Sequence, residues 1–246
     1  AIFAKDLRRI HSTMSFKTEL HCHTSDFSSC AHINGADTAE KYVNAGYRTL
    51  VITNHFVKGY HGIEDHTELC HKLFDAADIV RKAAGDRIHV LTGFELNFAD
   101  PGNPNDYLVY GLTLEDIVSM PDIFDMSPAE FHEETKKRGA LVIQAHPFRF
   151  GMRIVHPSFT DGVEVFNGHP GHDSHNEIAK MWGAYWMEQH DRDYILTSGT
   201  DHHDPHHVPD GGIESEEEIV TMDDLIRVLK SHKYFRIGNI MQRAEF

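Results

Sequence analysis

The sequence lacks any apolar run long enough to cross a membrane. A membrane-spanning helix needs about 20 consecutive apolar residues, and every apolar stretch of this chain is much shorter. The beginning of the sequence also lacks the apolar core of a secretory signal. Residues 1–13 carry three basic side chains and are expected to lead into the first strand. We therefore expect no association with a membrane.

Cysteine is scarce as well. The 246 residues include three, Cys22, Cys30 and Cys70, and no two of them form a CxxC pair. An odd number of thiols cannot all be bridged within one chain, and disulfides are rare in reducing compartments. The cysteine pattern therefore favours a cytoplasmic protein.

Positive charge is the third shortage. The chain has 23 Lys and Arg against 38 Asp and Glu, a net charge of −15 with histidine neutral. Proteins that bind long nucleic acids usually present a basic face, so we expect no long nucleic acid as a partner. Histidine, in contrast, is abundant, with 21 residues. Because neutral imidazole is the commonest metal ligand in proteins, this composition favours a metal site.

The pattern of apolar runs predicts one α/β domain over residues 1–246, because no linker rich in Gly, Pro or Ser divides the chain. Predicted strands lie at residues 16–23, 48–55, 88–97, 107–112, 140–145, 162–166, 194–198 and 234–238. Helical spacing is found at residues 37–45, 64–84, 127–138, 174–189 and 222–231. Continuously apolar strands that alternate with helices favour a parallel sheet covered on both faces, and this number of units suggests a complete or irregular barrel. An open doubly wound sheet is the alternative, but no GxGxxG loop follows the first strand.

Possible metal ligands stand at the ends of five predicted strands. They are His21 and His23, His55, Glu95, His146, and Asp201 with His203. Taken singly, each could be a hydrogen-bonded histidine or an acidic helix cap. In a parallel barrel, however, the C-terminal ends of the strands lie on one face, so residues distant in sequence meet there. The agreement of five strand ends therefore predicts a shared metal site.

The number of donors exceeds what one four-coordinate zinc ion takes. Two or three divalent ions fit better, and Glu95 is the natural bridge because a carboxylate has two oxygens. Closely spaced divalent ions serve the hydrolysis of phosphate esters, since they bind the anionic oxygens and lower the pKa of a water molecule.

The order of these motifs resembles the PHP (polymerase and histidinol phosphatase) family of metal-dependent phosphoesterases. The motifs are Glu19-Leu20-His21-Cys22-His23-Thr24, Ile52-Thr53-Asn54-His55, Gly93-Phe94-Glu95-Leu96-Asn97, Ala145-His146-Pro147-Phe148-Arg149 and Ser198-Gly199-Thr200-Asp201-His202-His203. The resemblance implies an irregular (β/α)7 barrel with a site for two or three divalent ions (zinc, manganese or iron) at the C-terminal face of the strands. It implies three ligand sets: His21, His23, Glu95 and Asp201 for one ion, Glu95 and His146 for a second, and His55 and His203 for a third.

The sequence departs from the family pattern at three places. Asn54 stands where the family usually has Asp, and residues 107–112 contain no histidine where many members have one. Many members also place an Asp or His shortly after the first motif, and here Asp26 or His32 is the candidate. These departures leave the choice between two ions and three open.

The predicted function is hydrolysis of a small phosphate monoester or phosphodiester, with a metal-activated hydroxide as the nucleophile. Arg149 follows the fourth motif closely and is a candidate to bind the phosphate; a surface ion pair is an equal alternative. Two other functions stay open. One is an amidohydrolase-like C–N hydrolase, although no lysine ends a central strand; the other is a non-catalytic metal-bearing binding or regulatory module.

Overall fold

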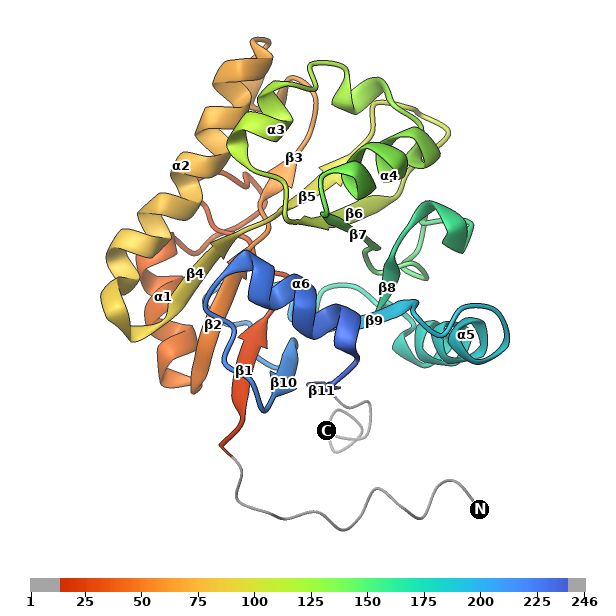
Figure 1. Ribbon diagram of the computed structural model, residues 1–246. Coiled ribbons are helices and arrows are strands. Elements are labelled where there is room, and N and C mark those ends of the chain that lie inside the picture. The colour runs from red at the N-terminus through yellow and green to blue at the C-terminus, as the bar shows by residue number, and fades with distance from the viewer. Residues whose placement is uncertain (1–13, 239–246) are drawn as a thin grey trace.

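Eleven strands form two mixed sheets in the computed structural model, which describes residues 14–238 (Figure 1). The expected leader at residues 1–13 lies outside the described residues. The first sheet has the order β11-β10-β1-β2-β4, and its strands are Tyr234–Arg236, Ile213–Ser215, Phe16–Glu19, Tyr47–Ile52 and His89–Thr92. The second has the order β3-β5-β6-β7-β8-β9, and its strands are His55–Phe56, Phe94–Asn97, Asp106–Tyr110, Leu141–Gln144, Gly162–Asn167 and Ile195–Gly199.

Two predicted strands each contribute to both sheets. The prediction for residues 48–55 corresponds to β2 and β3, and that for residues 88–97 corresponds to β4 and β5. The second break is at Gly93, where a Cβ atom would lie 2.8 Å from the carbonyl oxygen of Val109. A glycine therefore permits the close approach of the neighbouring strand at the point where the chain passes from one sheet to the other.

The predicted all-parallel arrangement is wrong for part of the fold. β6 runs antiparallel to both β5 and β7, and β10 runs antiparallel to β1. A parallel connection needs a crossover of a dozen or more residues, and only residues 98–105 connect β5 to β6. The hydrogen-bonded ladders form two mixed sheets, so the predicted (β/α)7 barrel is not confirmed.

A further contact joins the two sheets where the predicted metal ligands lie. Cys22, beyond the end of β1, pairs with His202, beyond the end of β9, in an isolated parallel bridge. The N–H of Thr53, after β2, donates to the carbonyl oxygen of Cys22 over 2.8 Å. The segments that follow β1, β2 and β9 are therefore neighbours.

The helices lie outside the sheets (Figure 1), and their bounds follow the predictions closely. They are α1 (Gly35–Asn44), α2 (His66–Ala84), α3 (Leu114–Val118), α4 (Pro128–Lys137), α5 (Asn176–Gln189) and α6 (Met222–Ser231); the sequence did not predict α3. The expected start of α4 is confirmed, because Ser127 and Glu130 form a reciprocal capping box. Within residues 14–238, no helix is both long and apolar enough to span a bilayer.

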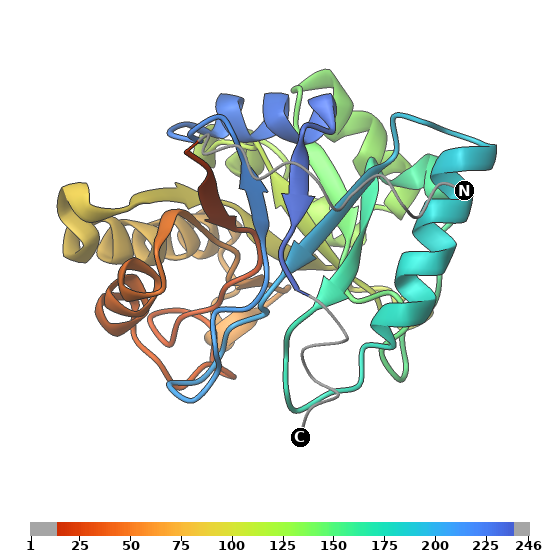
Figure 2. The same ribbon diagram turned by 90° about the horizontal axis from the view of Figure 1, so that it is seen from below.

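The interior between the sheets is apolar on the side of α6. Leu20, Val51, Tyr110 and Ile143 are buried there against Leu225 and other residues of α6. The loops that follow β1, β8 and β9 extend to the opposite side of the molecule (Figure 2). The side chains predicted as metal ligands therefore gather at the end of the strands that α6 does not cover.

Candidate metal centre

His21 and His23 lie in an extended segment after β1. The N–H of His23 donates to the carbonyl oxygen of His202 over 2.9 Å, which holds this segment beside the end of β9. Alternate side chains of an extended segment point to the same side, and both histidines are fully buried. The predicted His-x-His pair is brought together, because its two Nε2 atoms lie 3.1 Å apart.

Glu95 and Asp201 add carboxylates to this pair. Oε1 of Glu95 and Oδ1 of Asp201 each lie 3.3 Å from Nε2 of His21. Oε2 of Glu95 lies 3.2 Å from Nε2 of His23, and Oδ1 of Asp201 lies 3.4 Å from that nitrogen. Two ligands bound tetrahedrally to one zinc ion at about 2.0–2.1 Å lie about 3.3 Å apart. The spacing of these donors therefore fits a divalent cation.

Glu95 presents its two oxygens to different neighbours. Oε1 lies 3.1 Å from Nε2 of His146, and Oε2 lies 3.0 Å from Nδ1 of His55. His21, Glu95 and His146 form one group whose ligand atoms all lie within 4.8 Å of one another, while His21, His23 and Asp201 form a second. A carboxylate shared in this way is suited to bridge two cations.

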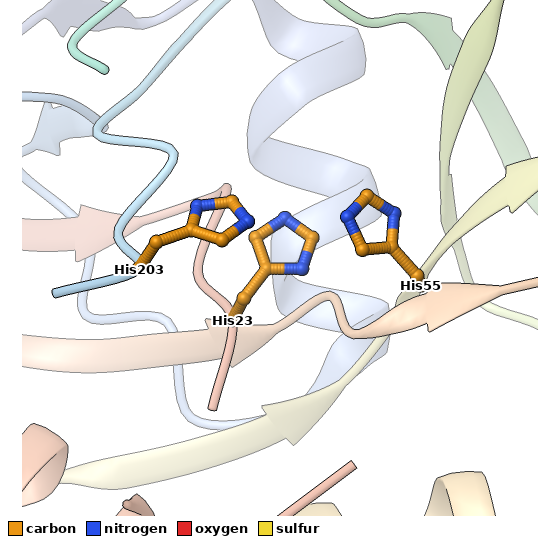
Figure 3. A group of neighbouring side chains, drawn as sticks. All are labelled: His23, His55 and His203. Carbon is orange, nitrogen blue, oxygen red and sulfur yellow. The ribbon is translucent and has the colours of Figure 1, made fainter. Parts of the chain in front are cut away.

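His23, His55 and His203 form a third group, again with ligand atoms within 4.8 Å. The ring centroid of His23 lies 4.4 Å from that of His55 and 4.2 Å from that of His203. Figure 3 shows His23 between the other two rings, with one nitrogen of His55 and one of His203 pointing toward it. All seven side chains predicted as ligands therefore lie in one place.

A second layer of polar side chains orients these residues. Oε1 of Glu164, in β8, lies 2.9 Å from Nδ1 of His21, and Oε2 accepts the backbone N–H of His146 over 3.0 Å. Asn167 donates to Oε2 of Glu164 and to Oδ2 of Asp201. A partner of this kind fixes the tautomer of a ligating histidine. Sequence reasoning missed Glu164, although a carboxylate inside an apolar strand was a visible signal.

Glu19 supports the neighbouring backbone from full burial. Its Oε1 accepts the N–H groups of His21 and Thr200 over 2.9 Å each, and its Oε2 accepts the hydroxyl of Tyr42 over 2.9 Å. Burial raises its pKa, while hydrogen bonds from Thr200 act in the opposite direction. This carboxylate ties the segment after β1 to the segment after β9.

Asp106 is a site residue that the sequence analysis did not identify. The family pattern places a histidine within residues 107–112, at the end of the fourth strand, but β6 runs antiparallel to its neighbours, so its first residue reaches the site. Oδ2 of Asp106 lies 3.9 Å from Nε2 of His146. Burial and the charge of Glu95 raise the pKa of Asp106. β6 therefore contributes Asp106, beside His146, instead of the histidine that the family pattern has at the end of this strand.

Arg149 lies on the cavity wall, as expected for a phosphate-binding residue, and also has partners within the protein. One of its nitrogens, Nη2, donates to Oδ2 of Asp201 over 2.6 Å and to Oδ1 of Asn167 over 2.8 Å. Since this guanidinium holds one oxygen of Asp201, the other oxygen faces the histidines. A structural role for Arg149 is therefore visible beside its predicted role with phosphate.

The other two departures from the family pattern, at Asn54 and at Asp26 or His32, also have structural counterparts. Asn54 is buried and accepts hydrogen bonds from the N–H of Thr24 and the hydroxyl of Ser28 over 2.8 and 2.9 Å. Asp26 accepts the N–H of Gly35 at the start of α1, which gives it a structural partner. His32 lies on the cavity rim with its side chain 73% exposed, 3.7 Å from Asp204. Asn54 therefore positions the segment after β1.

The buried carboxylates depend on nearby positive charge. Burial would raise the pKa of Glu95 and Asp201, but the charge of His21 and the contributions of the neighbouring side chains together outweigh this effect, and both pKa values are held well below the usual range. For His21, burial lowers the pKa, whereas Asp201 and Glu164 raise it, and the net result is a pKa well above the usual value. Protons on the imidazoles or a bound cation can supply the required charge, and metal binding displaces such protons.

Backbone geometry at the centre is unusual. His146 has φ 25° and Asp201 has φ 53°, in the left-handed region that non-glycine residues seldom adopt. Such conformations persist where the surrounding structure enforces them, often at functional sites. Gly199 approaches His21 so closely that a Cβ atom would lie 2.3 Å from the Cβ atom of the histidine. Local backbone strain and tight packing therefore accompany the close approach of these residues.

Five of the seven donors line a cavity of about 440 Å³, whereas His21 and His23 are fully buried and do not line it. Its inner wall includes His55, Glu95, Asp106, His146, Arg149, Asp201 and His203, and its outer wall includes Cys30, His32, His169, His172, Asp204 and His207. Burial lowers the pKa of His169 to about 4, so this imidazole is neutral near pH 7. The cavity presents nitrogen and carboxylate donors inside and mostly imidazoles at its mouth.

The chain is similar to solved proteins of related architecture. A two-domain protein from Bacteroides vulgatus, described as containing a predicted PHP-like metal-dependent phosphoesterase, matches with TM-score 0.63 and 16% identity over 92% of this chain and 65% of that one. The lesion-specific endonuclease PfuEndoQ from Pyrococcus furiosus matches with TM-score 0.60 and 14% identity, over 89% and 56%. An amidohydrolase from Chromobacterium violaceum, solved with bound sulfate and no metal, matches with TM-score 0.56 and 13% identity, over 89% and 98%.

These likenesses concern the fold. The chain spans less than two thirds of the first two structures, and no protein of curated function matches its sequence. The family model of the PHP domain, in contrast, matches residues 19–231. That range contains all seven of the gathered donors as well as Asp106 and Glu164. The chain therefore belongs to the PHP domain family.

Proposed function

We propose that this protein is a metal-dependent hydrolase of small phosphate esters. The observation that carries the proposal is the convergence of seven donors into three overlapping groups, five of whose members line one cavity. We propose that His21, His23, Glu95 and Asp201 hold one divalent cation, that Glu95 and His146 hold a second, and that His55 and His203 belong to a third. Zinc, manganese and iron are the candidate ions. The same proposal includes a single domain whose strands form an irregular (β/α)7 barrel.

Bound divalent ions supply two things to phosphate ester hydrolysis, an activated water and positive charge for the phosphate oxygens. The chain's own residues prepare the site for this role. Glu164 fixes the ring of His21, and the hydroxyl of Ser28 lies 3.2 Å from Nδ1 of His23. Arg149, at the cavity wall, is positioned to donate to a phosphate oxygen while it retains Asp201.

A small substrate is supported by the size and charge of the site. The cavity of about 440 Å³ is within the range of small-molecule pockets. The chain carries a net charge of −15, which opposes binding of a long polyanion. We therefore propose a phosphorylated small molecule, a monoester or a small diester, over duplex DNA.

The test is turnover of p-nitrophenyl phosphate, bis-p-nitrophenyl phosphate and a panel of phosphorylated metabolites by protein loaded with zinc, manganese or iron. A parallel reaction with duplex DNA carrying an abasic site examines the substrate class of the structurally similar endonuclease. Release of phosphate or nitrophenol by wild type, and not by Glu95→Gln, is expected. Metal-loaded protein that cleaves only the duplex would overturn the small-substrate proposal, and folded, metal-loaded protein inert on every ester would overturn the hydrolase proposal.

A further inference from the structure

His169 and His207 form a pair of imidazoles at the mouth of the cavity. They lie in the segments that follow β8 and β9, both line the cavity, and their ring centroids lie 4.8 Å apart. Among residues 14–238, neither belongs to a group of three donors spaced to hold a metal ion. The ring centroid of His169 nevertheless lies 5.2 Å from that of His203, one of the candidate ligands. The pair is therefore close to the part of a bound molecule that extends from the metal centre toward solvent.

The hydrogen bonds of the two rings fix the positions of their protons. The backbone N–H of Gly171 donates to Nδ1 of His169 over 3.0 Å, and that of His203 donates to Nδ1 of His207 over 3.1 Å. A ring nitrogen that accepts an N–H has a lone pair and no proton, so each imidazole is neutral with its proton on Nε2. Burial lowers the pKa of both rings, which favours the same neutral form. No residue of the described chain, 14–238, is hydrogen-bonded to either Nε2, so each ring keeps one N–H donor for a ligand.

The candidate metal ligands have the opposite arrangement. Nδ1 of His203 lies 3.0 Å from the carbonyl oxygen of Asp201, and Nδ1 of His21 lies 2.9 Å from a carboxylate oxygen. Because these oxygens accept hydrogen bonds, a neutral ring there bears its proton on Nδ1 and keeps the Nε2 lone pair that a metal ion needs. In His169 and His207 the proton is on Nε2 instead. The outer pair is therefore built to donate hydrogen bonds and not to bind a metal ion.

The pair is held in place by residues of the candidate centre. Oδ1 of Asn167 accepts the backbone N–H of His169 over 3.1 Å and a nitrogen of Arg149 over 2.8 Å. A Cβ atom on Gly171 would lie 2.9 Å from Cε1 of the His169 ring, so a glycine permits the loop to close on this imidazole. The other ring is held by the backbone of His203. The two donors are therefore positioned relative to the metal centre.

The surroundings of the pair favour an uncharged ligand group. Both rings are neutral, and the carboxylate of Asp204 lies on the same outer wall of the cavity. The chain as a whole carries a net charge of −15. Neutral N–H groups form ordinary hydrogen bonds with hydroxyl and carbonyl oxygens, whereas a second anionic group would meet this negative charge.

We propose that His169 and His207 bind a hydroxyl or carbonyl oxygen of the substrate at the cavity mouth, while the phosphate occupies the metal centre. The inference deepens the proposed function and rests on it. The substrate is then a phosphorylated molecule with such an oxygen a few bonds from phosphorus, as in a polyol phosphate. Neither imidazole gains or loses a proton, since each donates a hydrogen bond from Nε2 and stays neutral. The pair determines specificity.

Four-carbon phosphonates test this assignment, because their C–P bond is not hydrolysed and binding is measured without turnover. Butylphosphonate offers no second acceptor, dihydroxybutylphosphonate has hydroxyls on the two carbons farthest from phosphorus, and phosphonobutyrate has a carboxylate there. Calorimetric titration of zinc-loaded wild type should give the tightest binding for the dihydroxy compound. The gain over butylphosphonate should be about 2- to 10-fold for each hydrogen bond.

Variants assign this preference to the pair. His169→Ala and His207→Ala should each reduce it through weaker binding of the dihydroxy compound. His169→Gln should keep part of it, because the glutamine amide places an N–H near the position of Nε2. His206→Ala is the matched control, since His206 is exposed and does not line the cavity. Zinc content should equal that of wild type in every variant, and imidazole nitrogen NMR should show the proton of both rings on Nε2.

The outcomes separate the pair from the proposed function. A preference for the dihydroxy compound that is reduced in both alanine variants of the pair and retained in His206→Ala supports the assignment. Equal binding of the three phosphonates, tighter binding of phosphonobutyrate, no binding of any, or loss of zinc in His169→Ala and His207→Ala overturns it; turnover of phosphate esters in that case leaves the hydrolase standing. The expected preference in metal-loaded protein that hydrolyses no ester supports the binding site and overturns the proposed hydrolase.

Discussion

Oε1 of Glu164 lies 2.9 Å from Nδ1 of His21, and both side chains are buried. The other oxygen of Glu164 accepts the backbone N–H of His146. One carboxylate thus fixes residues from two different strand ends. It leaves Nε2 of His21 directed at Glu95 and Asp201.

Replacing this carboxylate by its amide should weaken metal binding without unfolding the protein. We expect Glu164→Gln to lower the affinity for the first ion by about 10–100-fold, as found for outer-sphere partners of ligating histidines. The measurement is competitive titration of zinc against a chromophoric chelator. Glu188→Gln, a matched change of an exposed residue on α5, is the control. Equal affinities in both variants would contradict the orienting role of Glu164.

The bridging position of Glu95 makes it the most sensitive ligand. Because its two oxygens lie beside His146 and His55, which belong to different groups of donors, Glu95→Gln should lower the metal content by more than one ion per chain. Activity on a phosphate ester should fall by about 100-fold or more, since loss of a ligand exceeds the outer-sphere effect. Metal content by elemental analysis, together with initial rates, checks both expectations. Retention of full metal content in the folded variant would count against bridging.

Chelation should lower thermal stability. The centre places Glu95 and Asp201 in the interior, and a ligand that binds only the folded state stabilises it by about 2.7 kcal/mol at 100 times Kd. The Tm of wild type should therefore fall on addition of a chelator and rise again with excess zinc. The same experiment on Glu95→Gln should show a much smaller change. An unchanged Tm in wild type known to contain metal would refute the linkage.

Arg149 gives a prediction that separates its two contacts. Charge-assisted hydrogen bonds contribute about 1.5–3 kcal/mol, so Arg149→Gln should raise KM for a phosphate ester by about tenfold or more. If Arg149 acts on phosphate, metal affinity should change much less than KM. Parallel metal titration and steady-state kinetics make the comparison. A loss of metal affinity with unchanged KM would assign Arg149 only to the positioning of Asp201.

Asp106 should contribute to activity although it lies at the start of β6 and not at its C-terminal end. Oδ2 of Asp106 is 3.9 Å from His146, a distance that bound metal or water can bridge. We expect Asp106→Asn to reduce activity more than the matched change Asp161→Asn, because Asp161 does not line the cavity and accepts the backbone N–H of Val142 in β7. Initial rates at saturating metal, with circular dichroism to verify folding, test this. Wild-type activity in Asp106→Asn would remove this residue from the site.

The residues that gather at the candidate centre could be picked out from the sequence because their signal is local. A histidine or carboxylate directly after an apolar run is visible in one dimension, and the structure brings all seven such residues together. The helix at residues 222–231 was predicted at its observed bounds for the same reason, since capping by Thr221 and apolar spacing are local.

Strand direction was not visible in the same way. The short, turn-rich connection at residues 98–105 contains two prolines and a glycine, and it reverses the chain so that β6 is antiparallel. The expectation of parallel strands placed the site at the wrong end of β6 and missed Asp106. Glu164 was missed because its partner His21 is 143 positions away. Pairings over such separations depend on the sheet order, which apolar periodicity does not specify.

The bridge between Cys22 and His202 bears on how the protein reaches its active form. It joins segments 180 residues apart, and the first histidine pair depends on it for its position. Contacts between such distant segments form slowly, since the loop that they close is long. During synthesis the seven donors therefore cannot all come together until the segment that carries Asp201 and His203, near the end of the family domain, has emerged from the ribosome.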